Sequence, residues 1–352
     1  MGPYPAAIPG AYVPAAVTLT RQQPDSLTGG NSLAVIDSAE TSLLRPRLKF
    51  MLGELLLGSW RPQLLVADPM RFGLAEWPDA PSLMRAALPA GADGFLCRKV
   101  DASRFEPGIG VYGDFIRYVR YRDVLHYVEI AGGFDDYLKR FSAKSRQNLT
   151  RSVRRFLERD PQRNGCEIYT AAADMQYFQR EAAAISQQTY QTRLLDAGLP
   201  ADAEFLQGML AAAERGEARG YLLRDGDRAI AFAWCRSHGD NLVYDIIGYL
   251  PDSASLSPGN VLLYLILQDV FSNGHYAILD FGPGEAQYKS MFATHRQEFQ
   301  DVYLLRDSLP HRLLLRLHYR LGTISADVGA LLERYGLKKR IKQLIRSLKG
   351  GA

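Results

Sequence analysis

Cysteine is scarce in this sequence, and its placement excludes the common cysteine-based sites. The 352 residues contain three cysteines, Cys97, Cys166 and Cys235, with no CxxC pair and no cysteine–histidine cluster. An odd number of widely separated cysteines suits a reducing compartment and argues against a disulfide framework or a zinc site. The six histidines show no paired metal spacing. We therefore expect no metal, and we interpret the cysteines as small core residues.

Long apolar runs and a basic N-terminal region are also missing. The longest strongly apolar run, residues 261–267, is far shorter than the roughly twenty residues of a membrane-spanning helix. The first basic residue is Arg21, whereas a secretory signal begins with positive charge. These absences predict a cytoplasmic protein, either soluble or bound peripherally to the inner face of the membrane.

Positive charge is concentrated near the C-terminal end of the sequence. The chain is 47% hydrophobic and 23% charged, as globular proteins are, and its net charge is +4. Residues 311–352 contain ten Lys and Arg against two acidic residues, a net charge of +8, so the remainder is acidic. Such asymmetry points to an anionic partner.

The first third of the chain predicts an arm followed by a small α/β region. Residues 1–30 hold five prolines and four glycines with little periodicity, which predicts a flexible arm. Residues 31–125 alternate short apolar segments with turns. Within them PQLLVADP (62–69) and GFLCRKV (94–100) predict strands, and LLRPRLKFMLGELLLG (43–58) predicts a helix.

The rest of the chain predicts a larger α/β region and a tail. Residues 126–308 predict a strand and a long helix, then strand, helices, three antiparallel strands, helix, strand, helix and strand. Asp225-Gly226 and residues 238–241 mark the turns between the antiparallel strands. Residues 309–352 predict basic amphipathic helices.

Three local patterns within this order of elements resemble one branch of the GNAT acyltransferases. They are SAKSRQNLTRSVRR (142–155), GYLPDSASLSPGNVLLYLILQ (248–268) and LDFGPGEAQYKSMF (279–292). Over residues 125–306 the chain resembles the CelD/FemAB-like, or acetyltransferase-6 type, GNAT proteins. The resemblance implies an α/β fold of two tandem GNAT-like domains around mixed sheets. Residues 31–125 would be a degenerate first domain, and residues 126–308 the acyltransferase domain.

The second pattern supplies the residues expected to bind the acyl donor. A helix begins at about Pro258, and a helix N-terminus presents free N–H groups that attract anions. In the GNAT fold this helix receives the pyrophosphate of coenzyme A, so the resemblance assigns Ser257, Gly259 and Asn260 to cofactor binding. The usual glycine signature, Q/R-x-x-G-x-G/A, is absent here. The alternative is an ordinary Ser-Pro helix start.

The third pattern supplies the residues expected to carry the chemistry. The resemblance assigns Tyr288 to protonation of the leaving thiolate, and Asp280 with Asp245 to holding or deprotonating the amine. Lys289 is expected to contact phosphate or an acidic acceptor. Two glycines break the strand after Asp280 and let backbone approach a ligand, namely Gly282 and Gly284. The alternative is that Asp280 caps the following turn and Tyr288 packs.

The first pattern predicts a helix with one apolar and one basic face. Arg151 and Arg155 continue a polar stripe that begins at Lys144 and Asn148, while the apolar residues lie on another face. The stripe predicts binding of a phosphorylated acceptor, a carrier protein or RNA. The alternative is a solvated face.

These observations predict an N-acyltransferase that moves an acyl group from acyl-CoA or acyl carrier protein to an amine. The resemblance implies a small-molecule or lipid amine acceptor: an amino sugar, a cell-envelope precursor or an amino-lipid. Residues 311–349 predict contact with anionic lipid or with an acidic carrier protein. One alternative is a FemAB-type transferase that uses aminoacyl-tRNA, although the sequence favours RNA less as a partner. The other is a non-catalytic module of a polysaccharide-synthesis assembly.

Overall fold

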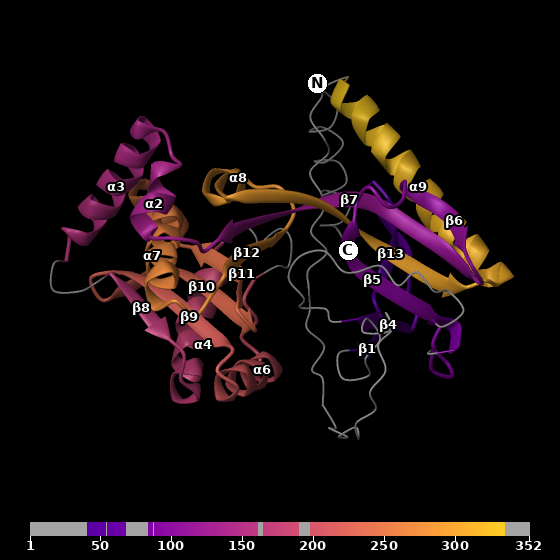
Figure 1. Cartoon of the computed structure of the whole chain (residues 1–352), viewed down its shortest axis with the longest axis horizontal. Helices are drawn as coiled ribbons and strands as arrows, with labels where there is room; N and C mark the ends of the chain where they lie inside the picture. Colours follow the sequence, from indigo (N-terminus) through magenta and orange to yellow (C-terminus); the bar gives the residue numbers. More distant parts are fainter. Residues whose placement is uncertain are drawn as a thin grey trace, which may run out of the picture. The chain divides into compact units, whose positions relative to one another are not determined.

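The computed structural model divides into two compact units, which are considered separately (Figure 1). Among the described residues, the second unit comprises those within 124–297, and the first comprises those within 41–123 and 298–334. The predicted arm, 1–30, and the end of the tail, 335–352, lie outside the described residues. The structure describes residues 41–53, 55–67, 84–86, 88–160, 165–189 and 198–334.

The first unit is a mixed sheet with one long helix. The sheet has the order β1-β4-β5-β13-β7, with β6 paired to β7 and a separate hairpin β2–β3. The pairs β1–β4 and β5–β13 are antiparallel, and β4–β5 is parallel. The elements are β1 (Thr41–Leu44), β2 (Leu48–Leu52), β3 (Leu55–Trp60), β4 (Leu64–Ala67), β5 (Gly94–Asp101), β6 (Gly108–Tyr112), β7 (Phe115–Glu129), β13 (His295–Arg306) and α9 (Leu309–Arg334).

The helix predicted for residues 43–58 is wrong, because this segment forms strand β1 and the β2–β3 hairpin. Gly53 adopts a positive φ of 60° at the hairpin turn, a conformation that glycine reaches without strain. Helix α9 then lies against β2, where the ring of Phe50 meets that of His318 at 5.4 Å. The leucine-rich sequence is compatible with either structure, and this long-range packing selects the strands.

The second unit confirms the predicted α/β class and most of the predicted elements. Its strands follow the order β7-β12-β11-β10-β9-β8, in which the β11–β12 pair is parallel. The elements are α2 (Phe134–Lys139), α3 (Ala143–Leu157), β8 (Cys166–Tyr169), α4 (Ala172–Ser186), α6 (Ala203–Glu214), β9 (Ala218–Asp225), β10 (Arg228–His238), β11 (Asn241–Tyr249), the 3₁₀ helix η2 (Pro251–Leu256), α7 (Pro258–Asn273), β12 (Ile278–Pro283) and α8 (Gln287–Phe292).

Helices α4 and α7 cover opposite faces of this sheet. A side chain at Gly220 on β9 would collide with the ring of Phe178 on α4, so α4 packs there. The next residue, Tyr221, donates its hydroxyl to Asp269 on α7 at 2.7 Å. Successive residues of a strand point to opposite faces, which places the two helices on either side. Arg219 also pairs with Asp269 at 2.6 Å and ties α7 to β9.

Local signals explain the boundaries of several elements. The Ser142 hydroxyl accepts the N–H of Ser145 at 3.2 Å and caps α3. Asp202 caps α6 in the same way through Phe205 N–H at 2.8 Å. The cysteines are core residues, as expected: Cys235 is buried, and burial raises the thiol pKa of Cys97 and Cys166 to about 12. They are therefore thiols at neutral pH.

The sequence-based domain boundaries at 125/126 and 308/309 stay predictions, as does the idea that the first unit is GNAT-like. The compact units divide the chain at Asp123/Val124 and Gln297/Glu298 instead, and α9 belongs to the first unit. No helix within the described residues is long and apolar enough to cross a membrane.

His318 makes the stability of the first unit depend on pH. Its ring is buried on α9 and shares a 2.6 Å hydrogen bond with the Tyr118 hydroxyl of β7. Burial, aided by the nearby Arg120, lowers the His318 pKa to about 4. Between that pH and about 6.5, unfolded chains bind a proton that the folded unit excludes, so stability falls as the pH falls.

We therefore expect His318→Gln to remove this pH dependence. Relative to the variant, the wild type should lose up to about 3 kcal/mol of unfolding free energy when the pH is lowered from 7 to 4. Urea unfolding, followed by hydrogen exchange in β7 and α9, measures it. A difference that stays constant across this pH range would contradict the assignment.

Candidate active site

Strands β11 and β12 pair only at their starts and then separate. The parallel register joins Asn241 to Ile278, Leu242 to Leu279 and Val243 to Asp280, and no further pair follows among the described residues. Beyond this point β11 continues to Tyr249 alongside β10, and β12 stays with β7. The edge of β11 from Tyr244 onward thus presents backbone N–H and C=O groups that no strand occupies.

Asp245 is the extra residue of a β-bulge in β11. Its neighbours Tyr244 and Ile246 pair with Cys235 and Trp234, which are adjacent on β10. A bulge leaves the extra residue out of the ladder and turns its backbone groups. The Asp245 carboxylate accepts from Arg236 at 2.6 and 3.0 Å. This carboxylate, predicted to hold the amine, is therefore already ion-paired.

Asp280 caps the break near the end of β12, where the pairing of this strand with β7 shifts register. Its side chain is 1% exposed, and its Oδ1 accepts the N–H of Gly282 at 2.7 Å. Gly282 and Gly284 have φ angles of 71° and 92°, which explains the two glycines in this turn. The Gly284 N–H donates to Val124 of β7 at 2.9 Å. The geometry matches the capping alternative, while a direct role of Asp280 with the amine stays a prediction.

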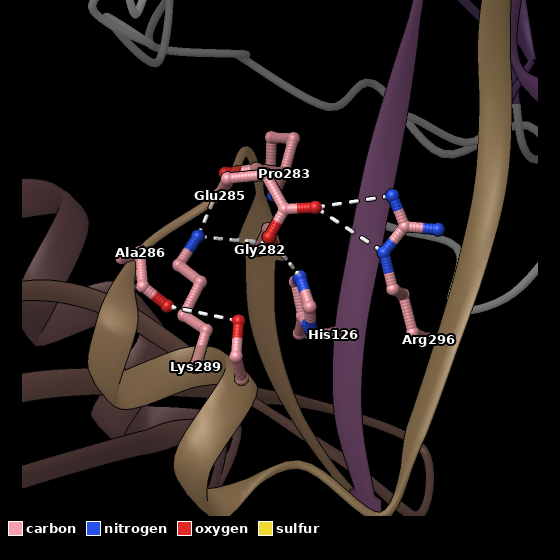
Figure 2. A network of polar contacts seen from close by, with 8 residues as sticks. His126, Gly282, Pro283, Glu285, Ala286, Lys289 and Arg296 are labelled. Carbon is pink, nitrogen blue, oxygen red and sulfur yellow. Dashed lines mark hydrogen bonds and ion pairs between the residues drawn. The ribbon is translucent and has the colours of Figure 1, made fainter. Parts of the chain in front are cut away.

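Lys289 holds the same break from the other side. Its ammonium group, buried at the start of α8, donates to the carbonyls of Gly282 at 3.1 Å and Pro283 at 2.7 Å (Figure 2). A buried ammonium needs such partners, because desolvation is otherwise costly. Lys289 is thus a positioning residue in this structure, and the predicted contact with phosphate or an acidic acceptor stays untested.

Tyr288 lies beside the opening between the two strands. Its ring packs edge-on against Phe281 of β12 at 5.9 Å and Tyr244 of β11 at 6.3 Å. The hydroxyls of Tyr288 and Tyr244 accept or donate no hydrogen bond among the described residues. Burial raises the pKa of both phenols above their usual value, so both stay protonated at neutral pH. Tyr288 therefore carries its phenol proton at neutral pH, and its role as the acid stays a prediction.

A pair formed by the buried His126 and the exposed Glu285 adjoins the strand break. His126 Nε2 lies 2.8 Å from Glu285 Oε2, and Arg296 donates to the other oxygen at 3.1 Å (Figure 2). Burial opposes ionisation of Glu285, but hydrogen bonds from His126 and Arg296 hold its pKa below the usual value. The side chain of Glu285 remains 56% exposed, so this carboxylate can meet a ligand.

Neither Tyr244 nor the His126–Glu285 pair was predicted from the sequence. The signal for Tyr244 was its position next to Asp245 in the predicted fourth strand. No sequence signal marks the pair, because His126 and Glu285 are 159 positions apart and meet only through the β7–β12 register.

The start of α7 is where the donor was predicted to bind. Ser257 has a left-handed φ of 52°, and its hydroxyl makes no capping bond, so the expected side-chain cap is absent. Its carbonyl accepts from Asn260 and Val261 at 3.0 and 3.1 Å. The N–H of Gly259 has no partner within the described part of the chain. Ser257 and Asn260 are exposed, so this end of α7 is accessible to an anion.

Helix α3 has the two faces that the sequence predicts. Leu149, Val153 and Phe156 are buried. Arg151 and Arg155 are exposed and form no ion pair with any described residue. Lys144 and Asn148, on the same stripe, are also exposed. The described residues contain no group of His, Cys, Asp or Glu that could hold a metal ion.

The parted strands, the bulge and Tyr288 of α8 all lie within a segment that matches a known domain family. Residues 143–290 match the family model described as an acetyltransferase (GNAT) domain. The resemblance to acetyltransferase-6 type GNAT proteins is thereby confirmed for this segment.

Solved structures resemble the chain at low identity. FemX is 12% identical over 77% of this chain and 90% of its own, with a TM-score of 0.48. The L-PGS of Bacillus licheniformis is 14% identical over 72% of this chain and 82% of its own, with a TM-score of 0.44. These likenesses carry no information on donor or acceptor. Comparison with curated proteins gives no match.

Lys289→Met should destabilise the strand break. The substitution leaves the carbonyls of Gly282 and Pro283 without their donor, at a cost of about 1–3 kcal/mol. Hydrogen exchange at residues 282–285 should accelerate, and the unfolding midpoint should fall. The control is Lys139→Met, which removes an exposed ion pair with Asp136 and should leave the unfolding midpoint almost unchanged. Equal effects of both substitutions would disprove the positioning role of Lys289.

Proposed function

We propose that this protein is an N-acyltransferase that moves an acyl group from a thioester to an amine. The donor is acyl-CoA or acyl carrier protein, which share the phosphopantetheine arm. The acceptor is an amine on a lipid, an amino sugar or a cell-envelope precursor. The separation of β11 from β12 beside Tyr288 carries this proposal, because it leaves backbone amides of β11 without a strand partner close to a phenol.

The unpaired edge of β11 supports stabilisation of the oxyanion. When the amine nitrogen attacks the thioester carbonyl carbon, negative charge develops on the carbonyl oxygen. Backbone N–H groups that no strand occupies, next to the bulge at Asp245, are fixed donors for that charge. They need no reorganisation at the moment of reaction.

Tyr288 supports departure of the thiolate. The tetrahedral intermediate collapses with cleavage of the carbon–sulfur bond, and the phenol gives its proton to the sulfur. A raised phenol pKa keeps that proton available at neutral pH. The amine gives its own proton to water, and the phenolate of Tyr288 regains a proton from water.

Glu285 supports recognition of the amine. Its carboxylate is ionised and half-exposed, so it attracts an ammonium group. A lowered pKa also makes it a weak base. We therefore assign it to orientation of the acceptor, rather than to deprotonation.

Substituting Tyr288, with Tyr276 as the control position, gives the sharpest test. Tyr288→Phe removes the acid and keeps the ring packing, so kcat should fall by about a hundredfold to ten-thousandfold with little change in KM. The matched control is Tyr276→Phe, which removes a tyrosine hydroxyl from another part of the same core. Thiol release from acyl-CoAs of several chain lengths, with phosphatidylethanolamine or glucosamine as acceptor, measures the rate.

The same variants test the proposal in cells. Mass spectrometry of lipids and envelope precursors should show an N-acylated species that disappears in the deletion. Wild type and Tyr276→Phe should restore it, and Tyr288→Phe should not. Full restoration of the N-acylated species by Tyr288→Phe would rule out the proposed role of Tyr288.

The unpaired cations of α3 support a second candidate, transfer from aminoacyl-tRNA. Arg151 and Arg155 lie on an exposed stripe that suits a phosphate backbone. Aminoacyl-tRNA binding should then weaken steeply with salt. Arg151→Gln/Arg155→Gln should reduce the slope of log K against log salt by about two, because each phosphate contact contributes about one.

Filter binding over a series of salt concentrations measures this slope. The charge-matched control is Arg154→Gln/Arg180→Gln, which removes two exposed arginines outside the stripe. Salt-independent binding, or equal slopes for both double variants, excludes the tRNA candidate.

A further inference from the structure

Helix α9 exposes a line of large apolar side chains. Leu309, Leu313, Leu317 and Ile324 are 75%, 65%, 50% and 47% exposed. The first three follow at intervals of four residues, and Ile324 lies seven residues beyond Leu317, so all four share one face of the helix. Isolated exposed leucines are ordinary on protein surfaces, but a continuous line over several turns indicates an interaction surface.

These leucines are not the face by which α9 packs on its own unit. Leu315 and His318 are buried, and the His318 ring meets Tyr118 and Phe50. They lie on the opposite side of the helix from Leu313 and Leu317, by the rotation of 100° per residue. The helix is therefore held by one face and presents a second apolar face outward.

Unpaired arginines run beside the exposed leucines. Arg316 follows Leu313 by three residues, and Arg320 follows Leu317 by three, so each arginine flanks its leucine. Both are exposed, and neither forms an ion pair within the residues described. A third exposed arginine, Arg312, pairs with Asp307 at 2.5 Å. Residues 309–326 contain no Asp or Glu, so this part of α9 is cationic.

The β2–β3 hairpin, which packs against α9, carries a second set of exposed leucines. Leu55, Leu56 and Leu57 are 50%, 44% and 54% exposed in three consecutive positions, although a strand ordinarily exposes alternate residues. The hairpin turn is tied to α9 by Ser325, whose hydroxyl accepts the Gly53 N–H at 3.0 Å and donates to the Met51 carbonyl at 3.0 Å. The leucines of the hairpin therefore lie next to the half of the helix that carries Ile324.

We propose that the outer face of α9 and the β2–β3 hairpin bind the surface of a membrane that contains anionic lipid. The leucines would enter the acyl boundary, and Arg316 and Arg320 would meet the headgroup phosphates. A second copy of the chain fits this surface less well. Two copies of the same face would bring the unpaired arginines of each face toward the other.

This inference concerns binding alone and does not depend on acyl transfer. It would place the second unit near lipid amines, which are one class of acceptor under the proposed function. A failure of membrane binding would leave an amino-sugar acceptor open, and a failure of catalysis would leave membrane binding intact.

Vesicle flotation with the full chain tests the proposal. The probes are phosphatidylcholine vesicles with and without phosphatidylglycerol. Wild type should float with the anionic vesicles and lose binding at high salt. Leu313→Gln/Leu317→Gln should weaken binding by about tenfold or more, because two leucine side chains no longer enter the bilayer. Arg316→Gln/Arg320→Gln should weaken it by about fivefold for each arginine, and only with anionic lipid.

Matched controls separate this face from general effects. Arg154→Gln/Arg180→Gln removes the same charge elsewhere, and Val111→Ser/Ile168→Ser removes exposed apolar residues elsewhere. Both should bind as wild type does. All variants keep residues 335–352, so any binding by that segment is common to them.

Two results would overturn the proposal. One is binding by the α9 variants equal to wild type, which would assign the membrane contact to another segment. The other is a wild-type dimer in light scattering that Leu313→Gln/Leu317→Gln dissociates, without vesicle binding, which would make a second copy the occupant.

Discussion

The parting of β11 from β12 is the constraint on which the candidate site depends. Three residues of each strand pair, and then the chain must keep two neighbouring strands apart within a sheet. Unpaired backbone groups are costly unless water or a ligand satisfies them. The bulge at Asp245 and the register shift in β12 after Asp280 both lie at this point. Each strand is held by its other neighbour, so the opening is a property of the sheet and not of a mobile loop.

The charged residues around this opening mostly maintain it. Asp280 and Lys289 fix the turn after β12 through Gly282, and Arg236 neutralises Asp245. These charged groups already form hydrogen bonds to the backbone or ion pairs with one another, which leaves them little capacity to act on a substrate. The phenols of Tyr244 and Tyr288 make no hydrogen bond with the described residues, and Glu285 is 56% exposed although both of its oxygens are hydrogen-bonded. The chemistry we propose is accordingly that of a preorganised site, in which positioned dipoles and one acid act on a reactive thioester.

Much of the second unit could be predicted from the sequence, because its signals are local. The Asp225-Gly226 turn, the Ser-Pro start of α7 and the apolar face of α3 each depend on residues a few positions apart. The predicted helix at 43–58 failed for the opposite reason. A leucine-rich segment suits either a helix or strands, and α9, more than 250 residues later, decides between them. The same distance conceals the contact between His126 and Glu285.

The sequence by itself determined the α/β class, the order of elements from β8 to β13, and the resemblance to a GNAT domain that residues 143–290 bear out. It also located Tyr288 and the two glycines. Only the tertiary structure decided what each carboxylate and cation does there. A carboxylate in a sequence is equally suited to a turn, an ion pair or a substrate, and its partners come from strands that meet across the sheet. Backbone register, which no side-chain pattern states, brought those partners together.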